Sequence, residues 1–219
     1  MSFEIASIIL ICNKNKYGKE YMEINIELFG IQLQSPFVIG SGPIGFSAEG
    51  MIRAHRQGAG AVVTKTIRDV PAENPYPHIA VSGRDSMINA EKWTDFSGDR
   101  WVEKEIPEAK AAGVVVIASI GHTQVEVENW VGKVAAAGAD IIELVSYTED
   151  TIIPMVQLAR EITDKPILVK ISPNWQDPVQ AALTCLELGA DGITAMDSIG
   201  PVLRIDIETR MPPVGGPKG

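Results

Sequence analysis

The chain has 219 residues, of which 45% are hydrophobic, and a formal net charge of −9 at pH 7. This length and apolar content suffice for one substantial core and exclude an intrinsically disordered protein. The acidic balance, with no basic stripe, argues against a nucleic-acid-binding protein, which needs clustered Lys and Arg.

Residues 1–22 are expected to form an N-terminal extension that ends in the polar linker NKNKYGKEY. Its apolar stretch, Ile5 to Cys12, is too short to cross a bilayer, and Glu4 stands where a signal peptide would carry a cation. Cys12 and Cys185 lie far apart without metal-ligand spacing, as in a reduced protein. We therefore expect a cytoplasmic protein with neither a membrane partner nor a metal site.

Residues 23–219 are expected to form one α/β unit that begins with a hairpin. From Glu23, the segment INIELFGIQLQSPFVIG alternates apolar and polar residues around Phe29-Gly30. Alternation with a period of two is typical of strands. The pattern predicts a hairpin that closes the bottom of a barrel and leads into the first barrel strand.

Apolar runs with a Gly, Ala or Pro boundary then recur along the chain. Continuous runs of this kind are typical of parallel strands that are buried on both faces. The runs are PFVIGSG (36–42), GAGAVVTKT (58–66), AGVVVIASIG (112–121), GADIIELVS (138–146), KPILVKIS (165–172) and GADGITAMDS (189–198).

Helix patterns separate these runs, and some have recognisable ends. Thr123 to Glu126 has the spacing of a capping box, and Asp177 precedes a proline at the first helical position. The alternation of strands and helices predicts a TIM (β/α)8-type barrel that is incomplete, with about six of eight βα units. The helices are expected near residues 47–57, 100–111, 124–137, 151–163 and 178–188.

The chain ends in MPPVGGPKG, where the link toward a seventh strand is expected. Three explanations stay open: a truncated or frameshifted gene, an enzyme split over two polypeptides, and a barrel completed in trans. The expected partner is accordingly either a second copy in a homo-oligomer or a complementing C-terminal chain.

Residues 67–99 break the rhythm of strands and helices. They are rich in Pro, Asn, Asp and aromatic residues, and they are too long for an ordinary connection between a strand and a helix. Long irregular segments at the carboxyl end of a strand commonly cover binding sites. We expect this segment to cover the site.

Each apolar run ends in a polar or charged residue, and barrel enzymes place their active sites at these strand ends. Two of the residues are lysines, Lys65 and Lys170, which would together stabilise a phosphate, a carboxylate, an enolate or a reduced flavin. The alternative interpretation is that each lysine reaches out of the core to solvent. His122 follows the third run on the same face and is a candidate ligand contact, whereas His55 and His78 are not.

An ordered set of motifs runs from about Ile24 to the end of the chain: SPFVIGSGPIG, GAGAVVTKTI, NPYPHI, SMINAEKW, ILVKISPN and ITAMDSIG. This set resembles dihydroorotate dehydrogenases and the related domain of dihydropyrimidine dehydrogenases. The resemblance implies an (α/β)8 barrel that binds FMN at the carboxyl ends of its strands. It also implies a flavin-dependent dehydrogenase that acts on a CH–CH bond of a small dihydropyrimidine-like substrate.

The resemblance also implies roles for individual residues. The positions that match the cofactor contacts are Ser41, Gly42, Thr64, Lys65, Lys170 and Ser198. The positions that match the substrate contacts are Asn89, Asp197 and Ser198, where Asp197 replaces an Asn of the family. Asn89 by itself is equally consistent with an ordinary turn residue.

The chain departs from the family after its fourth strand, where the family has Asn-x-Ser-Cys-Pro-Asn and its Cys or Ser removes the substrate proton. Here Thr148 takes the Cys position, and a threonine hydroxyl is a poor base unless a neighbour activates it. Glu149 is a candidate base if an apolar pocket buries it. The alternative is that Thr148 or Asp150 caps the next helix. The catalytic candidates are therefore Lys65, Thr148 and Glu149.

Two other functions stay open at this point. One is a flavin-free barrel aldolase in which Lys170 forms a Schiff base, helped by a second lysine nearby. The other is a non-catalytic truncated remnant. Flavin binding would distinguish the flavin-dependent dehydrogenase from both of these alternatives.

Overall fold

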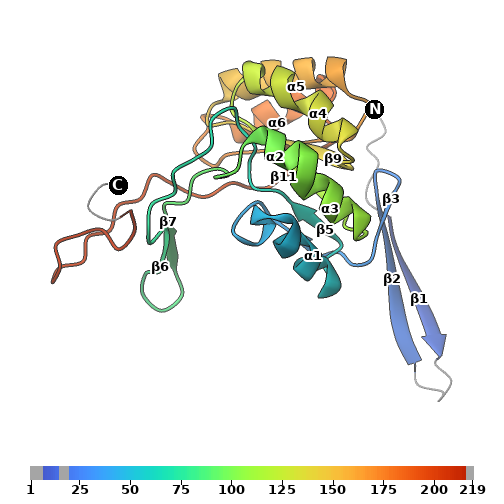
Figure 1. The fold of residues 1–219 in the computed structure, drawn as a ribbon, viewed down its shortest axis with the longest axis horizontal. Coiled ribbons are helices and arrows are strands. Elements are labelled where there is room, and N and C mark those ends of the chain that lie inside the picture. Colours follow the sequence, from blue (N-terminus) through green and yellow to red (C-terminus); the bar gives the residue numbers. More distant parts are fainter. Residues whose placement is uncertain (1–6, 15–19, 216–219) are drawn as a thin grey trace.

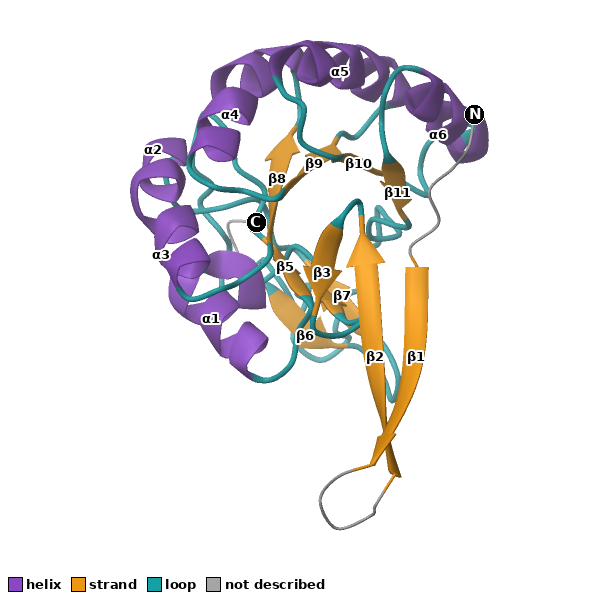
Figure 2. Cartoon of the chain, turned by 90° about the vertical axis from the view of Figure 1, so that its right-hand side faces the viewer, coloured by secondary structure: helices purple, strands orange, loops and turns teal. Residues whose placement is uncertain are grey.

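The computed structural model of the protein describes residues 7–14 and 20–215. Within these residues the main sheet has six parallel strands in the order β11-β10-β9-β8-β5-β4. Figure 2 shows this sheet curving into an open arc, with the helices in a second arc on its outer side. This arrangement confirms the predicted incomplete (β/α)8-type barrel. The strands are β4 (Val38–Ile39), β5 (Ala61–Val63), β8 (Val116–Gly121), β9 (Ile141–Val145), β10 (Ile167–Lys170) and β11 (Gly192–Thr194).

Helices connect the successive strands, and each predicted helix is present (Figure 1). The connection before β8 is one continuous helical stretch with a π-helical middle. After the short 3-10 turn η1 (Ile44–Phe46), the helices are α1 (Ala48–Arg56), α2 (Gly98–Arg100), η2 (Trp101–Glu105), α3 (Ile106–Ala111), α4 (Gln124–Ala136), α5 (Glu149–Ile162) and α6 (Pro178–Glu187).

The predicted helix starts are confirmed, with one difference. Asp177 caps α6 by accepting a hydrogen bond of 2.9 Å from the Gln180 N–H. Thr123 caps α4 in the same way, through the Glu126 N–H at 3.3 Å. The Glu126 carboxylate, however, accepts from the His122 N–H. In a capping box it would accept from the Thr123 N–H instead, and here it also binds the Arg68 side chain from another loop.

The predicted hairpin closes the bottom of the barrel. Strands β2 (Glu20–Leu28) and β3 (Ile31–Leu33) are antiparallel and turn at Phe29-Gly30, whose φ angles of 52° and 75° lie in the left-handed region. Ile26 and Leu33 of this hairpin form one apolar cluster with the inward residues Ala61, Val63, Ile117 and Ile141 of the barrel strands.

The N-terminal segment differs from the expected linker. Strand β1 (Ser7–Lys14) pairs with β2 along its full length, from Ser7 opposite Glu27 to Lys14 opposite Glu20. Both ends of the NKNKYGKEY segment are therefore strand, and its residues 15–19 lie outside the described residues. Strand β2 begins upstream of Glu23, and the predicted hairpin is therefore part of a three-stranded antiparallel sheet, β1-β2-β3.

Side chains along each barrel strand alternate between the inside and the outside of the barrel, and the inward ones change from apolar to polar along the strand. Outward residues such as Val62, Val116 and Ile142 join the core between sheet and helices. Inward residues are apolar near the hairpin and polar near the carboxyl ends, where Ser119 lies opposite Glu143. On β10, Leu168 lies opposite Glu143, and Lys170 lies two residues closer to the mouth, opposite Val145. Polar side chains therefore converge on the mouth of the barrel.

Residues 67–97 return over this mouth. They contain the hairpin β6 (Ile79–Val81) and β7 (Met87–Asn89), and the Thr94 N–H donates to the Thr66 carbonyl at 3.1 Å. Figure 1 shows the hairpin and the C-terminal stretch leaving the same side of the sheet, and the Gly215 N–H donates to the Pro77 carbonyl. Among the described residues, no helix combines the length and the apolar character needed to cross a membrane.

Candidate active site

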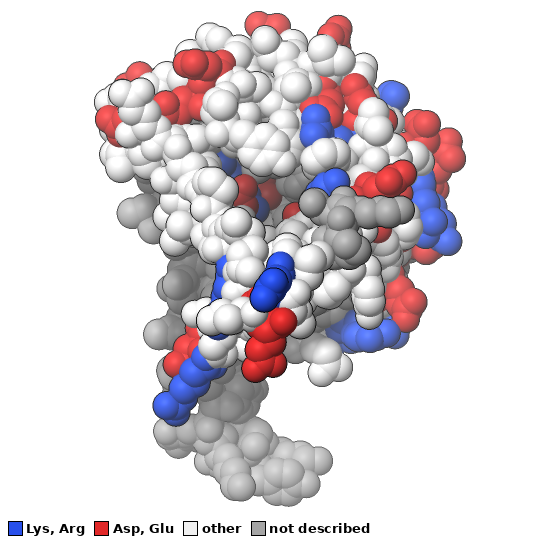
Figure 3. Space-filling view, turned by 90° about the vertical axis from the view of Figure 1, so that its left-hand side faces the viewer, with Lys and Arg blue, Asp and Glu red and all other residues white. Residues whose placement is uncertain are grey.

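A cavity of about 150 Å³ lies at the carboxyl ends of the strands. Figure 3 shows acidic and basic side chains side by side around the hollow in this face. Six residues that the sequence predicted as site residues line it: Ser41, Lys65, Asn89, Lys170, Asp197 and Ser198. The long segment after β5 adds Glu91, Lys92 and Trp93, and the loops after β8 and β9 add His122 and Tyr147.

Lys65 is held at the cavity wall by a close approach of two backbone segments. Its N–H donates to the Gly45 carbonyl at 2.9 Å. A Cβ atom on Gly45 would lie 2.0 Å from the Val63 carbonyl oxygen, so only glycine permits this contact. The Lys65 ammonium then reaches the Lys92 carbonyl at 2.5 Å and Glu91 Oε1 at 3.0 Å. Burial lowers the pKa of Lys65, and the Glu91 carboxylate opposes that shift.

Glu91 is placed by Asn89. The Asn89 Oδ1 atom accepts a hydrogen bond of 2.5 Å from the Glu91 N–H, a turn that aims the Glu91 side chain toward Lys65. Only 10% of the Glu91 side chain and 4% of the Lys65 side chain is exposed. The pair is therefore largely removed from water. In such a place, each charge needs the other to offset the cost of its burial.

A second ion pair stands on the opposite wall. Lys170 Nζ lies 3.1 Å from Asp197 Oδ1, and the Asp197 N–H donates to the Ile171 carbonyl at 2.9 Å. Below them Glu143 is fully buried, and Thr194 donates to its Oε2 at 2.9 Å. Burial raises the pKa of Glu143, while the Lys170 ammonium opposes that shift.

His122 forms an aromatic wall with two neighbours. Its ring stacks on Tyr147 with centroids 4.1 Å apart and meets the edge of Trp93 at 6.2 Å. Burial lowers the pKa of His122 to about 4, and the nearby Arg68 guanidinium adds to this effect. The ring is therefore uncharged near neutral pH, and its buried Nδ1 atom has no hydrogen-bond partner among the residues that the structure describes.

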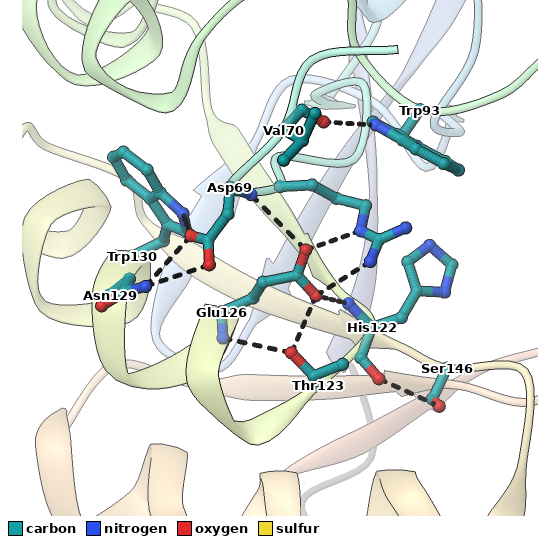
Figure 4. Close-up of polar contacts among 10 residues, drawn as sticks. Asp69, Val70, Trp93, His122, Thr123, Glu126, Asn129, Trp130 and Ser146 are labelled. Atoms are coloured by element: carbon teal, nitrogen blue, oxygen red, sulfur yellow. Dashed lines mark hydrogen bonds and ion pairs between the residues drawn. The ribbon is translucent and has the colours of Figure 1, made fainter.

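Glu126 fixes the loops that carry this wall, as Figure 4 shows. Its carboxylate accepts from Arg68 Nε at 2.6 Å, from the Asp69 N–H at 3.4 Å and from the His122 N–H. The Arg68 guanidinium in turn lies 4.4 Å from the Trp93 ring centroid. One buried carboxylate thus ties the loop after β5 to the loop after β8.

Four predicted site residues do not line the cavity. Thr148 stands at the N-cap position of α5, is exposed, and its Oγ1 lies 2.6 Å from Thr151 Oγ1. Glu149 Oε1 accepts from the Asp177 N–H at 2.6 Å, so it lies at a helix start and not in an apolar pocket. Thr64 is buried and accepts from the Ser119 N–H at 3.0 Å. Gly42 lies next to Ser41 but outside the lining.

Sequence reasoning missed Glu91, Trp93, Tyr147 and Glu143. The alternation of side chains along a strand could have identified Glu143, because it lies two residues after Ile141 and so faces the inside of the barrel as well. Glu91 and Trp93 belong to the SMINAEKW motif, but that motif gave them no role, because their placement depends on the path of a long loop. A larger cavity of about 540 Å³, between β4 and α1, contains none of the predicted site residues and is lined mainly by apolar side chains.

Comparison with known proteins matches residues 23–218 to the family model described as dihydroorotate dehydrogenase. The "Dihydroorotate dehydrogenase B (NAD(+)), catalytic subunit" of Pyrococcus abyssi is 28% identical over 202 residues, which are 86% of this chain and 67% of that protein. The proteins of the same name from Pyrococcus furiosus and Geobacter sulfurreducens are each 28% identical over 87% of this chain and 67% of their own length. The chain thus spans about two thirds of the length of these relatives.

Proposed function

Because this chain belongs to the dihydroorotate dehydrogenase family, we propose that it is an FMN-dependent oxidoreductase that acts on a CH–CH bond of a dihydropyrimidine-like ring. The observation that carries the proposal is the cavity at the carboxyl ends of the barrel strands, with Lys65 and Lys170 on its walls. Two cations at this place support chemistry in which negative charge develops on a ring.

The donors around the cavity fit one edge of a flavin. Lys170 supplies a cation and Ser41 a hydroxyl group, which suit the ring edge that becomes negative on reduction. The cavity admits a single small ring, which is the place proposed for the substrate, so an FMN molecule would lie at its edge and outside it. When bound, FMN would supply the acceptor for a hydride.

The chain's own residues position the substrate and exclude water. His122, Tyr147 and Trp93 offer flat faces on one wall, and the 67–97 segment covers the mouth. Asp197, Ser198 and the Asn89–Glu91 turn present hydrogen-bonding groups to a ring between the lysines. Polar groups of this kind orient a ligand within a pocket.

The residue that accepts the substrate proton stays a prediction. Thr148 and Glu149 hold the sequence positions next to the family's base, but both side chains make their contacts outside the cavity lining. The match to the dihydroorotate dehydrogenase family favours a dehydrogenase over the aldolase hypothesis.

We also propose that the protein works with a further polypeptide. The relatives from Pyrococcus and Geobacter are named as catalytic subunits. Either a complementing chain or a second copy would fill this role, and the fraction that copurifies with the protein from its native source distinguishes them.

The test is flavin uptake. The purified protein, together with any copurifying chain, is incubated with FMN. Unbound FMN is then removed, and the visible absorbance of the protein is recorded. We expect flavin absorbance in the wild type and at least about tenfold weaker FMN binding after Lys170→Met. Lys104→Met, on the outer helix η2, is the matched control. A colourless protein that takes up no FMN would contradict the proposal.

A further inference from the structure

The size of the cavity limits the substrate. At about 150 Å³ it matches the volume of an engineered protein cavity that admits benzene. One six-membered ring therefore fills it. The stacked faces of His122 and Tyr147 favour a flat ring in this place.

The charges of the lining are already balanced. Lys65 is paired with Glu91 at 3.0 Å and Lys170 with Asp197 at 3.1 Å. Lys92, the third cationic residue of the lining, is exposed and contributes its carbonyl oxygen to Lys65. The cavity thus offers no buried cation that lacks an anionic partner within the described residues.

A carboxylate on the ring would meet an unfavourable site here. It would have to separate Lys65 from Glu91, or lie beside the Glu91 carboxylate in a region removed from water. Buried like charges without compensation are costly, and proteins use them to reject unwanted ligands. An uncharged amide ring meets no such penalty, because its N–H and C=O groups can bond to the carboxylates and ammonium groups in place.

We infer that this cavity selects an uncharged six-membered cyclic amide, and that Glu91 excludes the same ring when it bears a carboxylate. The inference rests on the proposed function, since the ring is its substrate. Asn89 is the positioning residue, because its Oδ1 atom holds the Glu91 N–H and so fixes the direction of the Glu91 side chain.

The experiment compares two rings that differ only in a carboxylate, uracil and orotate, by calorimetry on the purified protein with any copurifying chain. We expect the wild type to bind uracil at least about tenfold more tightly than orotate. Glu91→Gln keeps the side-chain shape and removes the charge, so it should reduce or reverse that preference. Glu73→Gln, an exposed carboxylate in the same long segment, should leave it unchanged.

Wild-type protein that binds orotate as tightly as uracil would overturn the inference, and so would a preference that survives Glu91→Gln or a failure to bind either ring. FMN uptake is measured on the same samples. A flavin-loaded protein that prefers orotate defeats the inference alone. A protein that takes up no FMN but still prefers uracil defeats the proposed function and leaves the cavity's selectivity standing.

Discussion

The Lys65 ammonium lies 3.0 Å from Glu91 Oε1, and the two side chains come from different parts of the fold. Lys65 follows β5 inside the barrel, whereas Glu91 follows β7 in the segment that returns over the mouth. The contact therefore joins the barrel to its cover. It also fixes the local charge of the cavity.

Removing one partner of this pair should cost far more stability than removing both. Lys65→Met leaves Glu91 with the more distant His78, 3.8 Å away, and Glu91→Leu leaves Lys65 without its ion-pair partner. Each single change should cost about 3 kcal/mol, whereas the double variant should lie within about 1 kcal/mol of the wild type. Urea unfolding of the four proteins measures the cycle. The exposed pair Arg53–Glu49 on α1 is the control, and its single variants should change stability little. Additive losses at Lys65 and Glu91 would show that the two do not depend on each other.

Substitution of Glu126 should destabilise the fold more than substitution of any other carboxylate near the loops after β5 and β8. Glu126→Gln removes the charge that Arg68 requires and weakens the acceptor for the His122 and Asp69 N–H groups. We expect a loss of about 2 kcal/mol, less than for a fully buried pair because 21% of the Arg68 side chain is exposed. Glu128→Gln, exposed on the same helix, is the matched control. Equal unfolding midpoints for the two variants would refute the anchoring role.

Gly45→Ala should disturb the end of β5. The new Cβ would stand 2.0 Å from the Val63 carbonyl oxygen, so the backbone must move and the Lys65 N–H loses its bond to the Gly45 carbonyl. Overpacking of this kind typically costs about 1–3 kcal/mol. Gly40→Ala, where a Cβ meets nothing within 4 Å, is the control. Thermal unfolding of both variants decides the matter, and a Gly45→Ala protein as stable as its control contradicts the close approach.

His122 should make the fold sensitive to acid. Its pKa is about 4 in the folded protein and near 6.5 in the unfolded chain. The unfolded state therefore binds the proton first, and stability falls as the pH drops from 6.5 toward 4, by about 3 kcal/mol in total. The groups that face the ring are Arg68, Glu126, Asp197 and Lys170.

The comparison of wild type with His122→Gln isolates this contribution. The difference between their unfolding free energies, measured by urea titration at pH 7.5 and pH 4, should shift in favour of the variant at the lower pH. His55→Gln, on α1, should keep the wild-type dependence. Parallel pH profiles for the wild type and His122→Gln would mean that the folded protein protonates His122 as readily as the unfolded chain does.

Much of the architecture was predictable because it rests on local patterns. The apolar runs are strands buried on both faces, as in β9, where all five residues from Ile141 to Val145 are buried. The Asp177 cap and the Phe29-Gly30 turn also lie where the sequence placed them. Each of these features depends on residues close together in the chain, where the period of the side chains and the turn chemistry decide the outcome.

The site was predictable only in part. Ser41, Lys65, Lys170 and Asp197 meet at the cavity because parallel strands carry their carboxyl ends to one edge. Thr148 and Glu149 were predicted from sequence alignment alone. In the structure they lie at the start of α5, where the Glu149 side chain contacts the start of α6 and not the cavity. A residue at the first turn of a helix is directed by the helix axis, which a motif does not specify.

The sequence by itself determined that this protein is built from βα units with cations at the strand ends, since hydrophobic period and strand parity are properties of neighbouring residues. Only the tertiary structure decided that Glu91 neutralises Lys65 and that Glu126 ties Arg68 to the loop of His122. These contacts join residues on separate loops. Their geometry follows from how the loops pack over the sheet, and no local pattern encodes that path.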